Sequence, residues 1–159
     1  LTARGGTKRI SGKNIKMFCG KPIIEYSIRE AINSEQFDEV MVSTDSKEIA
    51  AITKKCGANI PFMRSKELAS DTTTDETLMG VLNDYKKIGQ QFKYMCCIYP
   101  TAPFVTADKL MSAMQLMREK NPEQIIPIVV SEMEVQDIDT EENWELAEIK
   151  YMLMQRKTI

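Results

Sequence analysis

A glycine-spaced basic loop near the start of the chain has the residue types of an anion-binding site. Gly5, Gly6 and Gly12 allow its backbone to bend tightly, so that amide groups can approach an anion closely. Mobile positive charge comes from Arg4, Lys8 and Lys13. The loop is not a Walker A motif, because five residues separate Gly6 from Gly12 and Asn14 stands where Ser or Thr would bind magnesium. The pattern predicts phosphate binding without identifying the phosphate.

Two aspartates near the end of the chain, Asp137 and Asp139, form a candidate metal site. In an extended segment, residues two apart point to the same side. Neighbouring carboxylates repel each other unless a cation lies between them, and magnesium is typically bound by one or two carboxylates together with substrate phosphates. A structural alternative stays open, in which Asp139 caps the following helix and Glu142 completes a capping box.

Two hydroxyl-rich stretches could supply hydrogen bonds to a base or a ribose. Residues 43–46 read Ser-Thr-Asp-Ser, and residues 71–74 read Asp-Thr-Thr-Thr. Each stretch precedes a predicted helix, so each could also be a polar helix entry. For residues 43–46 we favour this structural interpretation.

The absence of histidine narrows the possible chemistry. It excludes a Ser-His-Asp triad, a Cys-His pair and a histidine-ligated zinc site within this sequence. The four cysteines contain no Cys-x-x-Cys pair and are too few for a secreted disulfide framework, so we expect reduced, mostly buried thiols. Catalysis must then use carboxylates, lysines, hydroxyls, a hard metal ion or substrate positioning.

Charge is distributed unevenly along the sequence. Residues 1–24 contain six basic and no acidic side chains, whereas residues 25–159 contain 15 basic and 23 acidic ones. The basic first 24 residues of this otherwise acidic protein would attract a phosphate-bearing polyanion. A solvated basic arm or a nucleic-acid patch would show similar charge, but a protein with a pI near 5.4 and one basic stretch lacks the broad basic face of nucleic-acid-binding proteins. We therefore expect no nucleic-acid partner.

Helical and extended patterns alternate along the 159 residues, a length that suits one domain. No membrane-length apolar run and no signal-peptide core are present, so we expect a soluble, cytoplasmic protein without a membrane partner. Helices are predicted over 22–34, 46–56, from about 74, from about 106 and over 140–155. Strands are predicted over 38–44, 59–63, 94–99 and 125–130, with residues 1–3 as the end of another.

The apolar run at residues 94–99 fits a central parallel strand that is covered on both faces. The alternation as a whole predicts a three-layer α/β/α fold with a mostly parallel, Rossmann-like sheet. Ligands bind such folds at the carboxyl ends of the strands, where the polar loops lie.

Five motifs in order resemble one family, and they span nearly the whole chain. They read ARGGTKRISGKNIK, VSTDSKEIA, PFMRSKELASDTTT, CCIYPTAPF and EVQDIDTEENW. Together they resemble the CMP-sialic acid synthetase family of cytidylyltransferases. The residues of the last two motifs are most similar to the branch that activates pseudaminic acid. The resemblance implies a nucleotide-diphospho-sugar transferase fold, transfer of CMP from CTP to the anomeric hydroxyl of a nine-carbon acidic sugar, release of pyrophosphate, Mg²⁺ dependence and a homodimer.

The resemblance also implies roles for individual residues. The triphosphate of CTP would be held by Arg4, Thr7, Lys8, Lys13 and Asn14. The cytidine pocket would be lined by Arg64, Asp71 and Thr72, and the sugar would lie near Tyr99, Thr101 and Ala102. Asp137 and Asp139 would bind magnesium and, with Arg4 and Lys13, form the catalytic set. Because sialic acid synthetases usually have Gln and Ser where this chain has Tyr99 and Ala102, a different nonulosonic acid is favoured.

The chain departs from the family at one place. A long central block expected from the resemblance is missing near Gln124 and Ile125. That block normally carries further sugar-contacting residues and the extension exchanged between dimer partners. We expect the single nucleotidyltransferase domain, residues 1–159, to be joined here across a gap. A true deletion would leave an inert protein that binds CTP without chemistry; a CMP-N-acetylneuraminate synthetase is the other alternative.

Overall fold

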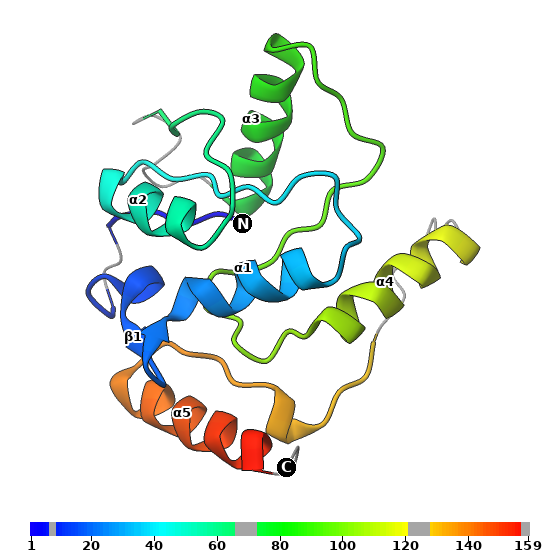
Figure 1. Ribbon diagram of the computed structural model, residues 1–159. Coiled ribbons are helices and arrows are strands. Elements are labelled where there is room, and N and C mark those ends of the chain that lie inside the picture. The colour runs from blue at the N-terminus through cyan, green and yellow to red at the C-terminus, as the bar shows by residue number, and fades with distance from the viewer. Residues whose placement is uncertain (7–8, 66–72, 121–127, 157–159) are drawn as a thin grey trace.

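The computed structural model describes residues 1–6, 9–65, 73–120 and 128–156 (Figure 1). The regular structure of these residues is mostly helical. The helices are α1 (Ile23–Asn33), α2 (Lys47–Lys55), α3 (Thr74–Lys87), α4 (Ala107–Lys120) and α5 (Glu141–Arg156), with the short 3-10 helices η1 (Lys13–Ile15) and η2 (Glu132–Glu134). Within the same residues, the one sheet is a hairpin that pairs β1 (Met17–Phe18) with β2 (Lys21–Pro22) in antiparallel orientation.

The five α-helices lie where the sequence predicts them, because local signals set their ends. Ser46 caps α2 by accepting a hydrogen bond from the amide of Ile49. Thr73 and Glu76 form a reciprocal capping box at the start of α3. Gly57 follows α2 with φ 92, a conformation that favours glycine. These signals act within a few residues and need no tertiary contact.

Among the described residues, the predicted parallel sheet is present only as isolated parallel bridges. Thr2 pairs with Ser43, and Met41 pairs with Asn59, so three segments run side by side in the same direction. The prediction of a strand at residues 94–99 is wrong, because this segment forms no regular structure. A parallel strand requires hydrogen-bonded neighbours, and no described segment pairs with the backbone of residues 94–98.

The remaining strand predictions are also only partly met. The strands expected over 38–44 and 59–63 are reduced to the bridges above. Of the strand expected over 125–130, residues 125–127 lie outside the described residues and residues 128–130 form no strand. Val129 is 91% exposed, so the apolar pattern of this segment is not satisfied by burial.

The four cysteines also differ from expectation. All are free thiols, but none is buried: Cys96 and Cys97 are exposed, and Cys19 and Cys56 are half-buried. The first pair is exposed because it lies in the unpaired 94–99 segment, where a central strand would have covered both side chains.

An aromatic cluster fixes α5 beside the first part of the chain. Phe18 is fully buried and makes edge-to-face contacts with Tyr26, Trp144 and Tyr151, with ring centroids 5.5–5.7 Å apart. Tyr26 also packs edge-to-face on Tyr151. These contacts join α5 to the β1–β2 hairpin and α1, next to which it lies in Figure 1. The packing places the residues before α5 beside the first loop.

A second cluster holds the parallel segments against α1 and α2. Ile24 and Ile28 of α1 are fully buried against Val42, and Ile49 of α2 and Ala3 complete the core of the cluster with Ala58. The first loop therefore starts from a packed position directly after Ala3. In the described part of the chain, no helix has the length and apolar character needed to cross a membrane.

Candidate active site

The first loop, residues 4–16, presses against the start of α2. The amide of Gly5 donates a hydrogen bond to Oδ1 of Asp45 at 2.8 Å. A Cβ atom at Gly5 would lie 3.0 Å from Cβ of Ser46, which is closer than side chains tolerate without displacement. Gly12 has φ 59 and directly precedes η1. Glycine is therefore favoured at both positions, at Gly5 because α2 approaches closely and at Gly12 because the backbone is left-handed.

Asn14 ties the two ends of the loop together. Its side chain is buried, and Nδ2 donates a hydrogen bond to the carbonyl oxygen of Arg4 at 3.0 Å. Arg4 itself is exposed. The amide of Asn14 thus shapes the loop from inside, while Arg4 presents its side chain to solvent. Direct contact of Asn14 with a triphosphate stays a prediction.

Asp139 lies among the cationic side chains of the first loop. Its carboxylate forms ion pairs with Arg9 and Lys13, and Nζ of Lys13 lies 3.5 Å from Oδ1 of Asp139. Arg9 and Asp139 are 130 positions apart in the sequence. The Arg9 guanidinium, with a smaller effect from Lys13, holds the pKa of Asp139 below its ordinary value. The fold therefore brings the loop and one of the paired aspartates to the same place.

Thr140, rather than Asp139, caps α5. The amide of Asn143 donates to Oγ1 of Thr140 at 3.2 Å, and Oδ1 of Asn143 accepts from the amide of Thr140 at 3.3 Å. This reciprocal pair is a capping box one residue later than the alternative predicted from the sequence. The structural alternative in which Asp139 caps the helix with Glu142 is therefore wrong, so helix capping does not explain the carboxylate of Asp139.

Lys16 fastens the far end of the loop to α5. It forms an ion pair with Glu141, and its Nζ lies 4.7 Å from the centroid of the Trp144 ring. Sequence reasoning assigned no role to Arg9 or Lys16. The signal was present, since both lie in the acid-free first 24 residues, while the partner of Arg9 belongs to the Asp-Ile-Asp motif and the partner of Lys16 lies two residues after it.

Arg64 is anchored on the segment that carries the 43–46 turn. Its Nε donates to Oγ of Ser43 at 3.1 Å and its Nη2 to the carbonyl oxygen of Ser43 at 2.7 Å. Burial lowers the pKa of Arg64, and Asp45 opposes this shift. The 43–46 stretch is the predicted polar turn, because Oγ1 of Thr44 accepts from the amide of Ser46, which caps α2. Arg64 therefore has a structural role whether or not it also meets a ligand.

The turn around residues 99–102 is held against α1. Oγ of Ser27 donates to the carbonyl oxygen of Tyr99 at 2.9 Å and lies 3.4 Å from that of Ala102. The side chain of Tyr99 is largely exposed, and Thr101 is half-buried. Backbone contacts fix this turn, which leaves the Tyr99 side chain free to meet a ligand.

The remaining predicted residues lie outside the described part of the chain: Thr7, Lys8, Asp71 and Thr72. Asp137 is exposed and makes no ion pair with another described residue. No group of three or more metal-binding side chains occurs within the residues described. Two carboxylates fit a hard ion such as Mg²⁺ only where phosphate and water oxygens complete its ligands, which is how magnesium is commonly bound.

Comparison with known proteins places the chain in a family. The cytidylyltransferase family model matches residues 1–156. The chain belongs to the cytidylyltransferase family. A pseudaminic acid cytidylyltransferase of Campylobacter jejuni is 42% identical over 114 residues, which cover 71% of this chain and 49% of that protein. The family predicted from the five motifs is thereby confirmed, and this cytidylyltransferase is of the CMP-sialic acid synthetase type.

Two further proteins extend the comparison. A CMP-N,N'-diacetyllegionaminic acid synthase of Legionella pneumophila is 32% identical over 146 residues, which cover 90% of this chain and 63% of that protein. The solved structure of CMP:2-keto-3-deoxy-manno-octonic acid synthetase complexed with CTP matches with a TM-score of 0.59 at 20% identity, over 76% of this chain and 46% of that one. This likeness shows an α/β nucleotidyltransferase fold. The cytidylyltransferase spans about half the length of the Campylobacter relatives it matches.

Proposed function

We propose that the protein transfers CMP from CTP to the anomeric hydroxyl of a nine-carbon acidic sugar and releases pyrophosphate, with pseudaminic acid as the favoured sugar. The observation that carries this proposal is the meeting of Lys13 and Asp139 at 3.5 Å, because it joins the phosphate-binding loop to the paired aspartates. The family match over residues 1–156 and the 42% identity to a pseudaminic acid cytidylyltransferase support the reaction and the sugar.

In the proposed site, the loop residues bind the triphosphate and the aspartates bind the metal. Arg4, Lys8 and Lys13 would neutralise phosphate oxygens, and the hydroxyl of Thr7 would donate a hydrogen bond to one of them. Asp137 and Asp139 would hold Mg²⁺, which when bound neutralises phosphate charge and lowers the pKa of the attacking hydroxyl. Arg9 and Lys13 already surround Asp139, so the carboxylate is positioned before any ligand enters. Such preorganisation is what charge stabilisation in a transition state requires.

The reaction itself asks for positioning more than for covalent help. The anomeric hydroxyl loses its proton to solvent, and its oxygen forms a bond to the α-phosphorus of CTP. The bond from that phosphorus to the bridging oxygen breaks, so that pyrophosphate leaves with the electron pair. Displacement at phosphorus depends mainly on alignment and charge neutralisation. The cations of the first loop can supply both without histidine, which this chain lacks.

Other parts of the proposal concern the two substrates and the whole protein. Cytidine would be bound near Arg64, Asp71 and Thr72, and the sugar near Tyr99, Thr101 and Ala102. We also propose a three-layer α/β/α fold with a mostly parallel sheet, a homodimer and a cytoplasmic location. Residues 124–125, near which the central block is expected, fall outside the described residues, and the pseudaminic acid cytidylyltransferase of Campylobacter jejuni is about twice as long as its matched part. An intact mass near 18.1 kDa would show that the block is absent.

Pyrophosphate release tests the proposal directly. The purified protein is incubated with CTP, Mg²⁺ and a panel of nonulosonic acids that includes pseudaminic and N-acetylneuraminic acid. We expect release with pseudaminic acid and a loss of ~10²-fold or more in turnover for Asp137→Ala, by analogy with other lost electrostatic contacts. Unchanged turnover in Asp137→Ala would remove Asp137 from the metal site.

The two alternatives give different results in the same assay. A preference for N-acetylneuraminic acid would identify the sialic acid branch in place of the pseudaminic acid branch. CTP binding by calorimetry, without pyrophosphate release in the presence of any of the sugars, would identify an inert CTP-binding protein. We retain this second function because the matched residues cover 49% of the Campylobacter jejuni relative.

A further inference from the structure

The carboxylate of Asp139 has a cation at each of its two oxygens. Nη1 of Arg9 forms an ion pair with Oδ2, and Nζ of Lys13 lies 3.5 Å from Oδ1. In the proposed function the same carboxylate binds Mg²⁺, for which carboxylate oxygens are preferred ligands. A metal ion and these side chains therefore compete for the same atoms, because a second cation at one oxygen is repelled by the first.

The two cations differ in how firmly the fold holds them. The side chain of Lys13 is 18% exposed, whereas that of Arg9 is 71% exposed. Lys13 begins η1, and Arg9 lies outside any helix or strand. An exposed guanidinium keeps most of its hydration, so a surface ion pair of this kind opens at little cost in free energy. Arg9 is therefore the cation that can leave Asp139.

Asp139 does not need Arg9 to keep its place. The amide of Asp139 donates to Oδ1 of Asn143 on α5 at 3.4 Å. The preceding residue, Ile138, is 2% exposed and belongs to the buried aromatic cluster. These contacts hold the backbone of the aspartate segment from the inside. Its carboxylate therefore stays in the site when the guanidinium moves away.

We propose that Arg9 is an exchangeable counter-cation, which covers Oδ2 of Asp139 in the absence of metal and leaves it when a divalent cation binds. This inference rests on the proposed function, because it takes Asp139 as a metal ligand. Without the exchange, a metal ion at Asp139 would lie against the positive charge of the guanidinium. Arg9 is thus a positioning residue that balances the charge of Asp139 and lowers the affinity of the free protein for metal.

The exchange gives an order of loading to the site. When Arg9 covers Asp139 in most molecules, the apparent metal affinity falls in proportion to the fraction in which the carboxylate is open. The triphosphate of CTP supplies further oxygen ligands, which offset this loss. Metal alone should therefore bind the protein weakly, and metal together with CTP should bind it more tightly.

Mn²⁺ binding to the whole protein without CTP tests the exchange. Mn²⁺ replaces Mg²⁺ as the probe because both prefer oxygen ligands, and the EPR signal of free Mn²⁺ measures binding without any turnover. Arg9→Gln keeps a polar side chain and removes the charge. We expect it to bind Mn²⁺ ~3–10-fold more tightly than the parent, as an open fraction of about one third to one tenth in the parent requires.

The chemical reactivity of Arg9 gives a second readout in the parent chain. Phenylglyoxal modifies arginine side chains, and an ion pair with a carboxylate slows this reaction. Saturating Mn²⁺ should raise the modification rate of Arg9 by ~3-fold or more, measured by peptide mass spectrometry, because the guanidinium is released. Arg29, which pairs with Glu25 within α1, is the internal reference and should not respond.

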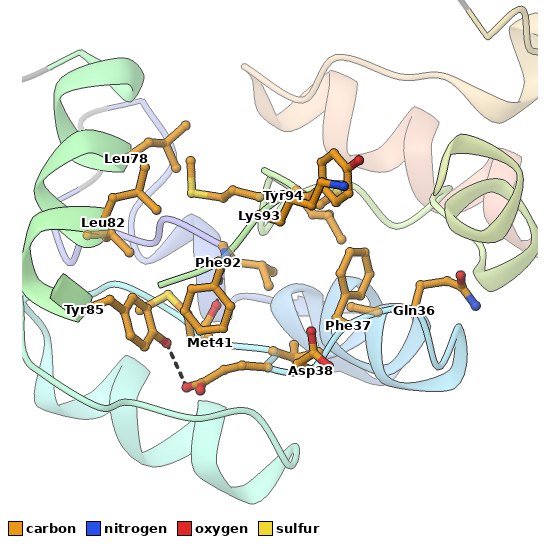
Figure 2. A pocket seen from close by; sticks show the side chains of 18 of the residues that line it. Gln36, Phe37, Asp38, Met41, Leu78, Leu82, Tyr85, Phe92, Lys93 and Tyr94 are labelled. Carbon is orange, nitrogen blue, oxygen red and sulfur yellow. Dashed lines mark hydrogen bonds between the residues drawn. The ribbon is translucent and has the colours of Figure 1, made fainter. Parts of the chain in front are cut away.

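An apolar groove of about 300 Å³ lies apart from these contacts, between α3 and the segments 36–41 and 91–98 (Figure 2). In Figure 2, Leu82 and Tyr85 of α3 form one side, and Phe37 lies on the other. None of the residues assigned above to CTP, sugar or metal lines the groove. Nothing among the described residues shows what covers it, so we assign it no ligand and place only a control there.

Arg118 on α4 supplies this control, because it lines the groove and is exposed like Arg9. In Figure 1, α4 ends on the right, whereas the loop before β1 lies on the left. Arg118→Gln is thus the same substitution at a distant place. Lys21→Gln removes a charge from the basic first 24 residues, where Lys21 pairs with Glu25. Both control variants should bind Mn²⁺ like the parent.

Equal or weaker Mn²⁺ binding by Arg9→Gln relative to the parent would overturn the proposal, and so would an absence of binding in both. An equal gain in Lys21→Gln or Arg118→Gln would also overturn it, since net charge would then be the cause. A modification rate of Arg9 that does not respond to Mn²⁺ would show that the guanidinium stays on Asp139, which contradicts the exchange.

A further pair of variants separates this inference from the proposed function. Loss of the tight Mn²⁺ binding of Arg9→Gln when Asp139→Asn is added would support both. Equal binding by the parent and Arg9→Gln, lost in Asp139→Asn alone, would overturn only the exchange. Tight binding retained in the double variant would remove Asp139 from the metal site and so contradict that part of the proposed function as well.

Discussion

Two regions of this protein differ in how tertiary contacts complete them. Around the first loop, aromatic packing and ion pairs join residues from both ends of the chain, and Phe18 at the centre is fully buried. Around the groove, large apolar side chains such as Phe92 and Met95 remain more than a third exposed, and residues 94–98 pair with no described segment. The described part of the first loop is thus held by tertiary contacts, whereas the apolar side chains around the groove between α3 and the segments 36–41 and 91–98 are only partly covered.

The difference shows that the shape of the first loop does not depend on the packing of the residues that line the groove. The loop obtains its shape from glycine conformation, one buried amide and contacts to α2 and α5. None of these needs the residues that line the groove. We therefore expect perturbations at the loop and at the groove to have distinct consequences for stability and for activity.

The largest expected effect is on stability, and it contrasts the two regions directly. Phe18→Ala should lower the free energy of unfolding by about 3–5 kcal/mol, because it removes a fully buried ring from the aromatic cluster. Phe92→Ala at the groove should cost about 1 kcal/mol, since that ring is 37% exposed and packs mainly on Tyr85. Urea denaturation measures both. Similar losses for the two variants would show that the groove is packed as well as the loop region.

Removing the charge of Asp139 should act on turnover rather than on folding. Asp139→Asn should reduce pyrophosphate release by ~10²-fold or more, because the proposed metal ligand is lost. Its melting temperature should change little, since Thr140 and not Asp139 caps α5. Glu145→Gln, an exposed carboxylate on α5, is the matched control and should retain activity. A parallel loss of stability and turnover in Asp139→Asn would instead indicate a structural role.

The close approach at Gly5 predicts a smaller, local effect. Gly5→Ala places a Cβ atom 3.0 Å from Cβ of Ser46, so the loop or α2 must shift, and we expect a loss of about 1–3 kcal/mol in unfolding free energy. Gly6→Ala is the control, because no atom lies within 4 Å of the added Cβ. Equal effects of the two substitutions, measured by thermal denaturation, would contradict the contact between the loop and α2.

The smallest effect concerns the titration of Asp139. Its pKa is depressed in the folded protein, so the stabilising contribution of its ion pairs is present above the ordinary value of 3.8 and is lost as pH falls through the lower folded value. A carboxyl-resolved NMR titration should give a midpoint below 3.8 in the parent chain. Arg9→Gln should move that midpoint upward, and a midpoint that does not respond would remove Arg9 as the cause.

The helices of this protein follow from local sequence, and its sheet does not. The predicted helix starts near residues 46 and 74 agree with the structure, in which Ser46 and Thr73 cap the two helices. The apolar run at 94–99 was equally clear as a pattern, yet the segment is irregular. A helix satisfies its backbone within four residues, whereas a parallel strand depends on neighbours that lie far along the chain.

Within the candidate active site, the types of residues were evident from the sequence but their partners were not. The glycine-spaced loop predicted phosphate binding, and the Asp137–Asp139 pair predicted metal binding. The five motifs indicated the family that the comparison confirms. The contacts of Asp139 with Arg9, and of Lys16 with Glu141, could not be read from spacing. Each joins residues more than 120 positions apart.

The sequence by itself therefore determined two things about this protein. It set the residue types available for chemistry, a histidine-free set of cations and carboxylates, and it set the positions of the five helices. Only the tertiary structure decided that Asp139 turns to Arg9 and Lys13, and that an apolar groove of about 300 Å³ lies between α3 and the segments 36–41 and 91–98. The physical reason is range. Propensity and capping act over one helical turn, while ion pairs, strand pairing and cavities depend on how distant segments pack.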